Sequence, residues 1–161
     1  MPSGIVHAQA SAFLSLPCAA LAYGAAANLP PREAAIHAGA AALGCLAGIP
    51  LSPDLDQEGL SSAESWIIKA TFGLGFLWAM LWYPYARLVP HRSWVSHAPL
   101  VGTTGRLAYM GLFVAVAMAA GWKPPLVPLA WVGWAVCGLA ISDSAHWFMD
   151  TKLPRRSRRR R

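Results

Sequence analysis

Charged residues are scarce in this sequence. They occupy 12% of its 161 positions, whereas hydrophobic residues occupy 56%. A soluble domain usually carries about a quarter charged residues, so this balance argues against a soluble protein and indicates a membrane protein. The length suits one folded unit and little more. We therefore expect a single domain of apolar helices.

Paired cysteines are also missing. Cys18, Cys45 and Cys137 each stand alone in an apolar stretch, and the sequence has no CxxC spacing. A zinc ribbon or a dithiol redox site would need such a pair, so neither is supported. We interpret the three thiols as buried small hydrophobic groups. The N-terminus lacks the basic region of a signal peptide, so residues 8–28 are predicted to stay as a helix.

The net charge of +6 arises mainly at one end of the chain. Six of the thirteen basic residues lie in Arg155–Arg161, and the remainder is nearly neutral. Beside a membrane helix, such a tail is typical of a cytoplasmic anchor on anionic lipid, which we favour over nucleic-acid binding. We predict a membrane helical metal-binding domain over residues 1–153 and a polybasic cytoplasmic tail over residues 154–161.

Five apolar segments follow one another, separated by proline-rich or polar breaks. They cover about Ala8–Ala27, Glu33–Ile49, Ser65–Tyr85, Leu107–Gly121 and Leu126–Asp150. Four of them approach the ~20 residues that a helix needs to cross a bilayer. The third contains Lys69 and the break Gly73-Leu74-Gly75 and has an aromatic end, which suits an interfacial or re-entrant segment better. The predicted fold is an all-α membrane bundle with about four transmembrane helices and one non-crossing segment.

This topology brings the polar residues together. If the third segment does not cross, every break that carries a histidine or an aspartate faces the same side, and both termini lie there too. The arginine tail makes that side cytoplasmic. Four of the five histidines and the aspartates then gather at one end of the bundle: His7, Asp54, Asp56, His91, His97, Asp143, His146 and Asp150. If the third segment crosses, the two halves lie ~30 Å apart and form no common site.

His146 and Asp150 lie one helical turn apart and can chelate one cation. Imidazole nitrogen and carboxylate oxygen suit a divalent metal: zinc above all, or manganese or iron. Each fragment alone also fits a simpler role, such as a hydrogen bond at a helix end, a solvated Asp54-Leu55-Asp56 turn, or a basic patch around Arg92. Taken together, they predict a metal site. His37 lies in the middle of a segment and is interpreted as a packed helix histidine.

Several of these motifs also resemble a known family in their order along the chain. They are Met1-Pro2-Ser3-Gly4 with His7, Ser52-Pro53-Asp54-Leu55-Asp56, Trp82-Tyr83-Pro84-Tyr85, Pro90-His91-Arg92-Ser93 with Ser96-His97, Gly102-Thr103 with Arg106 and Tyr109, and His146 with Asp150. This order is similar to an uncharacterised bacterial family of membrane metal-binding proteins, of the DUF2227 type and common in cyanobacteria. That family in turn is similar to the YdjM-like membrane-bound metal-dependent hydrolases. The resemblance spans almost the whole chain.

The resemblance implies kinship with helical enzymes that cleave phosphate esters at a metal cluster. It implies His7, Asp54, His97, His146 and Asp150 as metal ligands, with Asp56 as a further ligand, a residue that supports a ligand, or a base. His91 and Arg92 would support the ligands and clamp the phosphate. The expected function is therefore a metal-dependent hydrolase of phosphate esters, with a lipid or lipid-linked phosphate as substrate, on the cytoplasmic face of the bacterial inner membrane. The alternative is a non-catalytic metal-binding or scaffold protein, such as a sensor or a subunit with a structural metal.

Overall fold

The computed structural model describes residues 4–57 and 59–152, and over these ranges the chain is all-α, as predicted. The predicted tail over residues 154–161 lies outside the described residues. The helices are α1 (Gly4–Ala25), α2 (Pro31–Ala47), the short 3₁₀ helix η1 (Pro53–Asp56), α3 (Ser62–Ala70), α4 (Gly75–Leu88), α5 (Trp94–His97), α6 (Val101–Ala119) and α7 (Leu129–Lys152).

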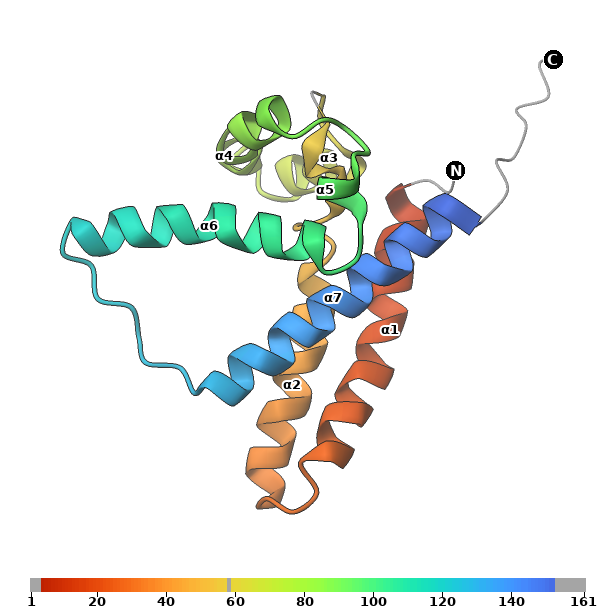
Figure 1. The fold of residues 1–161 in the computed structure, drawn as a ribbon, viewed down its shortest axis with the longest axis vertical. Coiled ribbons are helices and arrows are strands. Elements are labelled where there is room, and N and C mark those ends of the chain that lie inside the picture. Colours follow the sequence, from red (N-terminus) through yellow and green to blue (C-terminus); the bar gives the residue numbers. More distant parts are fainter. Residues whose placement is uncertain (1–3, 58, 153–161) are drawn as a thin grey trace.

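Helices α1, α2 and α7 pack against one another and form the core of the molecule (Figure 1). The buried residues of α1 recur every three or four positions and form one face: His7, Ser11, Ser15, Cys18 and Ala22. Small residues allow α2 and α7 to approach closely, because a Cβ on Gly138 would lie 2.1 Å from the carbonyl oxygen of Ala41. Close packing through small side chains is typical of membrane helices.

The third apolar segment forms a helical hairpin, with its break where the sequence predicted it. Helix α3 ends at Ala70 and α4 begins at Gly75, and the turn between them places Phe72 and Gly73 at φ 51° and 96°. The Thr71 hydroxyl accepts a 2.7 Å hydrogen bond from the Gly75 amide across this turn. The hairpin packs on η1 through a cluster of Leu55, Trp82 and Tyr85.

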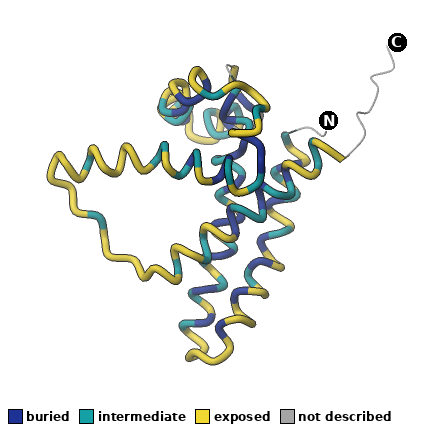
Figure 2. The backbone as a smooth tube through the Cα atoms, viewed as in Figure 1, coloured by how far each residue is buried: buried dark blue, intermediate teal, exposed yellow. Residues whose placement is uncertain are grey.

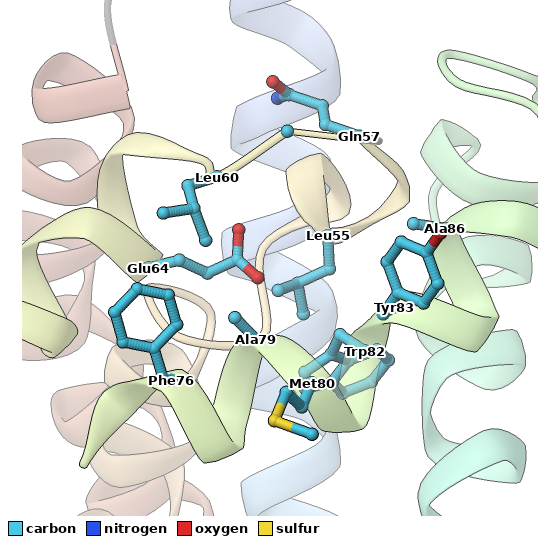
Figure 3. A pocket seen from close by; sticks show the side chains of 11 residues that line it. Leu55, Gln57, Leu60, Glu64, Phe76, Ala79, Met80, Trp82, Tyr83 and Ala86 are labelled. Carbon is cyan, nitrogen blue, oxygen red and sulfur yellow. The ribbon is translucent and has the colours of Figure 1, made fainter. Parts of the chain in front are cut away.

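A pocket of about 350 Å³ lies between η1, α3 and α4 (Figure 3). It is lined mainly by apolar side chains, and Glu64 is its acidic member. The Glu64 carboxylate accepts a 2.7 Å hydrogen bond from the amide of Ser61, while the Ser61 hydroxyl accepts one from the Glu64 amide. This reciprocal capping box begins α3, so the carboxylate already has a structural role.

Helix α6 projects sideways from one end of the bundle and lies transverse to the α1–α2 hairpin rather than alongside it (Figure 1). Its outer part and the connection to α7 are exposed (Figure 2). On length and composition alone, two of the described helices can cross a membrane, namely α1 and α6. Helix α6 begins at Val101, whereas the apolar pattern predicted a start near Leu107, because its first turns carry the buried polar residues Thr103 and Arg106.

Candidate metal centre

The last turns of α7 and the first turn of α1 meet at one end of the bundle. His146 and Asp150 share one face of α7, and His146 Nε2 lies 3.4 Å from Asp150 Oδ2. The other oxygen of Asp150 lies 3.2 Å from His7 Nε2. The rings of His7 and His146 stack with centroids 3.8 Å apart. Two helices from opposite ends of the sequence therefore converge on the Asp150 carboxylate.

Two more residues, Asp54 and His97, approach His146 from the short helices η1 and α5. Asp54 lies in η1, where the Ser52 hydroxyl accepts a hydrogen bond from its amide. His97 ends the short helix α5. Asp54 Oδ1 lies 3.7 Å from His146 Nε2 and 3.9 Å from His97 Nε2. Two groups of three residues with metal-binding side chains result, His7–His146–Asp150 and Asp54–His97–His146, and they share His146.

The spacing of these atoms matches that of ligands around a metal ion. Two ligands ~2.1 Å from one zinc ion and at a tetrahedral angle lie about 3.4 Å apart. The four contacts that join the five residues span 3.2 to 3.9 Å. Among the described residues, the Nε2 atoms of His97 and His146 are buried and make no hydrogen bond. A buried nitrogen without a partner is costly, and a bound metal ion would satisfy both atoms.

Asp56 lies beside this cluster but its oxygens are already engaged. The side chain is fully buried; one oxygen contacts His91 Nδ1 at 2.6 Å, and the other accepts a 2.9 Å hydrogen bond from the Arg92 amide. The second oxygen also lies 3.3 Å from His97 Nδ1. Burial opposes ionisation of Asp56, but hydrogen bonds from His97, Ser96 and His91 outweigh it and lower the pKa of the carboxyl to about 2. A carboxylate this acidic is a weak base at neutral pH.

A small pocket opens onto the cluster. Its volume is about 170 Å³, and its walls include the candidate ligands His97 and Asp150. Arg92 and two tryptophans, Trp94 and Trp147, complete its lining together with Ser93, Ala98 and Thr151. Arg92 is exposed and has φ 58°, a left-handed conformation rare for residues other than glycine. The hydrogen bond from its amide to Asp56 holds the backbone there, and Arg92 lines the same pocket as the candidate ligands His97 and Asp150.

The structure brings five of the predicted ligands together and places the others around them. His7, Asp54, His97, His146 and Asp150 converge, as described above. Asp56 and His91 contact each other next to this cluster. His37 belongs to neither group and is buried in α2.

Sequence reasoning missed a buried ion pair beside the cluster. The guanidinium of Arg106 on α6 contacts Asp143 on α7, and both residues are buried. The signal was a single arginine near the start of an apolar helix, together with an aspartate three residues before His146. Charged groups in such surroundings are expensive unless they are paired.

Comparison with known proteins supports a metal site. The family described as uncharacterized metal-binding protein (DUF2227) matches residues 2–132. The matched range contains Asp54 and His97, whereas His146 and Asp150 lie beyond its end. No curated protein matches the chain, and no solved structure does.

Proposed function

This chain belongs to the family of uncharacterized metal-binding proteins, and on that premise we propose that it holds one divalent ion at the end of its helical bundle. The candidate ligands are His7, Asp54, His97, His146 and Asp150, which form two groups of three that share His146. The observation that carries the proposal is the pair of buried, unpartnered nitrogens on His97 and His146, which face carboxylate oxygens at ligand spacing.

One ion fits the geometry better than two. A neutral imidazole nitrogen has a single lone pair and binds one metal, and the contacts of His146 with both Asp54 and Asp150 run through the same atom, Nε2. The two groups therefore compete for one ion, which either group would hold through His146, one further histidine and one aspartate. Two imidazoles and one carboxylate, with a position left open for water, suit zinc, with manganese and iron as the alternatives.

Asp56 is assigned the role of holding His97 in place. By accepting a hydrogen bond from the Nδ1–H group, Asp56 would keep the proton on Nδ1 and leave the Nε2 lone pair of His97 free for the metal. A carboxylate behind a ligating histidine is a common arrangement, and it fixes both the tautomer and the direction of the ring. His91 contacts the same carboxylate from the outer side and completes its hydrogen bonding.

The test of the metal centre is the metal content of the detergent-purified protein. We expect near-stoichiometric zinc in the wild type and a large loss in both His97→Ala and Asp54→Asn, because these residues come from different loops and meet only at the ion. His37→Ala is the matched control, since His37 is buried in α2 and lies outside both groups. Equal metal content in all four proteins would contradict the proposal.

Many large hydrophobic side chains are exposed on the described helices, which supports a membrane location. We propose crossings by α1, α2, α6 and α7, with α6 turned alongside the other three in the bilayer rather than transverse to them as in Figure 1. The α3–α4 hairpin would lie at the interface and the metal centre on the cytoplasmic side. The 3.2 Å contact of His7 with Asp150 supports this arrangement, because it places the start of α1 and the end of α7 on one face. The arginines of residues 154–161, outside the described ranges, would bind anionic lipid there.

Labelling of single cysteines tests this topology. In a variant without the three native cysteines, Leu60→Cys and Leu88→Cys flank the hairpin, and Lys123→Cys lies in the connection between α6 and α7. All three positions are exposed. With a membrane-impermeant maleimide, we expect Leu60→Cys and Leu88→Cys to react from the cytoplasmic side and Lys123→Cys from the opposite side. Reaction of the two hairpin positions from opposite sides would mean that the hairpin crosses.

We further propose that the centre hydrolyses phosphate esters at the membrane surface. A divalent ion bound there supplies a nucleophile at neutral pH, because it lowers the pKa of a bound water from ~15.7 towards ~7. Arg92 in the 170 Å³ pocket stands where a guanidinium can bind phosphoryl oxygens next to the ligands. The tryptophans of the pocket suit the membrane interface, which favours a lipid phosphate as substrate. A non-catalytic metal site, in a sensor or a structural subunit, is the alternative.

A further inference from the structure

A network of buried polar groups joins three helices next to the metal centre. Arg106 on α6 is 1% exposed and Asp143 on α7 is 2% exposed. The guanidinium contacts Asp143 Oδ2, and the Thr103 hydroxyl donates to the same oxygen. A second guanidinium nitrogen donates a 3.1 Å hydrogen bond to the backbone carbonyl of Ser96, which lies in α5. Arg106 therefore ties α5 to α7.

The two groups that Arg106 contacts, the Ser96 carbonyl and the Asp143 carboxylate, each lie close to a proposed ligand in the chain. We call this connection through Arg106 the bridge. Ser96 immediately precedes His97, and its hydroxyl lies 2.9 Å from His97 Nδ1. Asp143 lies one helical turn before His146 on α7. The planar guanidinium thus spans the gap between the two chain segments whose histidines approach Asp54.

Helix α5, which carries His97, needs contacts with neighbouring helices to hold its position. Helix α5 has only four residues, too few to be stable through its own hydrogen bonds. The start of α6 is pressed against it, because a Cβ on Gly102 would lie 2.1 Å from the Ser96 carbonyl oxygen. A glycine at this position allows α6 to come close enough for Arg106 to reach the carbonyl.

We propose that Arg106 and Asp143 are positioning residues that set the distance between His97 and His146 to fit one divalent ion. This inference rests on the proposed metal centre. A buried ion pair contributes little net stability compared with apolar residues of similar volume, whereas removal of one partner leaves an unpaired charge. The pair would thus be retained for the geometry it imposes rather than for stability.

A double variant tests whether Arg106 and Asp143 position the ligands or only stabilise the fold. Arg106→Met with Asp143→Leu replaces the pair by apolar side chains and avoids a lone buried charge, so we expect it to fold. We expect its zinc affinity, measured by competition with a chelator, to fall about 10–100-fold, the usual cost of losing a group that supports ligands. The visible absorption of the cobalt-substituted protein should change as well, because it reports the ligand geometry.

A second variant keeps the charge and changes the shape. Arg106→Lys has a compact ammonium that cannot span both Asp143 and the Ser96 carbonyl as the fork of arginine does, so we expect the same change of the cobalt spectrum. Arg32→Lys, at an exposed position in the first turn of α2, is the control and should leave the spectrum unchanged. Wild-type affinity and spectrum in both Arg106 variants would overturn the inference and leave the metal centre intact. Absence of metal from the wild type would instead overturn the proposed function itself.

Discussion

Asp54→Asn is expected to abolish the hydrolysis of phosphate esters. Asp54 Oδ1 faces the Nε2 atoms of both His97 and His146, so it supplies the negative charge between two neutral ligands. An amide oxygen carries no net charge and binds a divalent cation more weakly. Because uncatalysed phosphate-ester hydrolysis is among the slowest reactions known, loss of the ion leaves turnover indistinguishable from background.

Arg92→Ala is compared with Asp54→Asn because it tests activity separately from metal binding. Arg92 lines the pocket but belongs to neither group of ligands, so we expect the protein to retain its zinc. Turnover should fall about 10²–10³-fold, the usual cost of removing one group that stabilises transition-state charge. Arg32→Ala, at an exposed residue of α2, should change neither quantity.

The measurement uses zinc-loaded protein in detergent with a soluble phosphodiester, a soluble phosphomonoester and phosphatidic acid in mixed micelles. Turnover of phosphatidic acid well above that of the soluble esters would support a lipid substrate. A wild type that is full of metal and hydrolyses none of the three would contradict the hydrolase proposal. The non-catalytic role of the metal would then be the better interpretation.

The convergence of the ligands could be predicted because polar residues are so few. If the apolar segments of such a chain cross a membrane, each histidine or aspartate at a break is confined to one side, and the parity of the crossings decides which side. His7 and Asp150 are at opposite ends of the sequence, yet this reasoning brought them together, and their side chains lie 3.2 Å apart.

The separate roles proposed for Asp54 and Asp56 could be predicted only in part: the family resemblance implied Asp54 as a ligand but left Asp56 as a further ligand, a residue that supports a ligand, or a base. Both follow the same prolines and both are aspartates. The 3₁₀ turn of η1 has ~3 residues per turn, so side chains two positions apart point in different directions. The Asp54 carboxylate thus faces the Nε2 atoms of His97 and His146. The Asp56 carboxylate faces Nδ1 of His97 and the backbone amide of Arg92. Sequence spacing alone does not reveal which is which.

The ion pair between Arg106 and Asp143 could not be predicted, for a different reason. Arg106 and Asp143 belong to different helices, and no periodicity connects residues so far apart in the chain. The orientation of α6 could not be predicted either, because its apolar pattern is the same whether the helix lies alongside the bundle or transverse to it. These features depend on how helices pack, which local patterns do not encode.

Gly138→Ala is expected to disrupt the metal centre from a distance. Gly138 lies in the contact between α7 and α2, where an added Cβ would lie 2.1 Å from the carbonyl oxygen of Ala41 and 2.7 Å from the amide nitrogen of Cys45. Both atoms belong to the backbone and cannot rotate away, so the helices must separate. Extra atoms in a packed core typically cost ~1–3 kcal/mol, occasionally more.

The separation matters for binding because α7 carries two of the proposed ligands. His146 lies about two turns beyond Gly138, and Asp150 lies one turn further. The other ligands come from α1 and the loops, so a shift of α7 relative to α2 changes the spacing between the two sets. We therefore expect both a lower melting temperature and a large loss of zinc affinity, measured on the same preparation.

Gly133→Ala is the matched control, with the same substitution on the same helix. A Cβ at Gly133 meets nothing within 4 Å among the described residues. Alanine favours a helix over glycine by about 1 kcal/mol, so this variant should keep its zinc and be at least as stable as the wild type. If Gly138→Ala binds zinc as tightly as Gly133→Ala, the close contact of α2 and α7 does not determine the ligand geometry. The centre would then depend on the loops and on the bridge formed by Arg106.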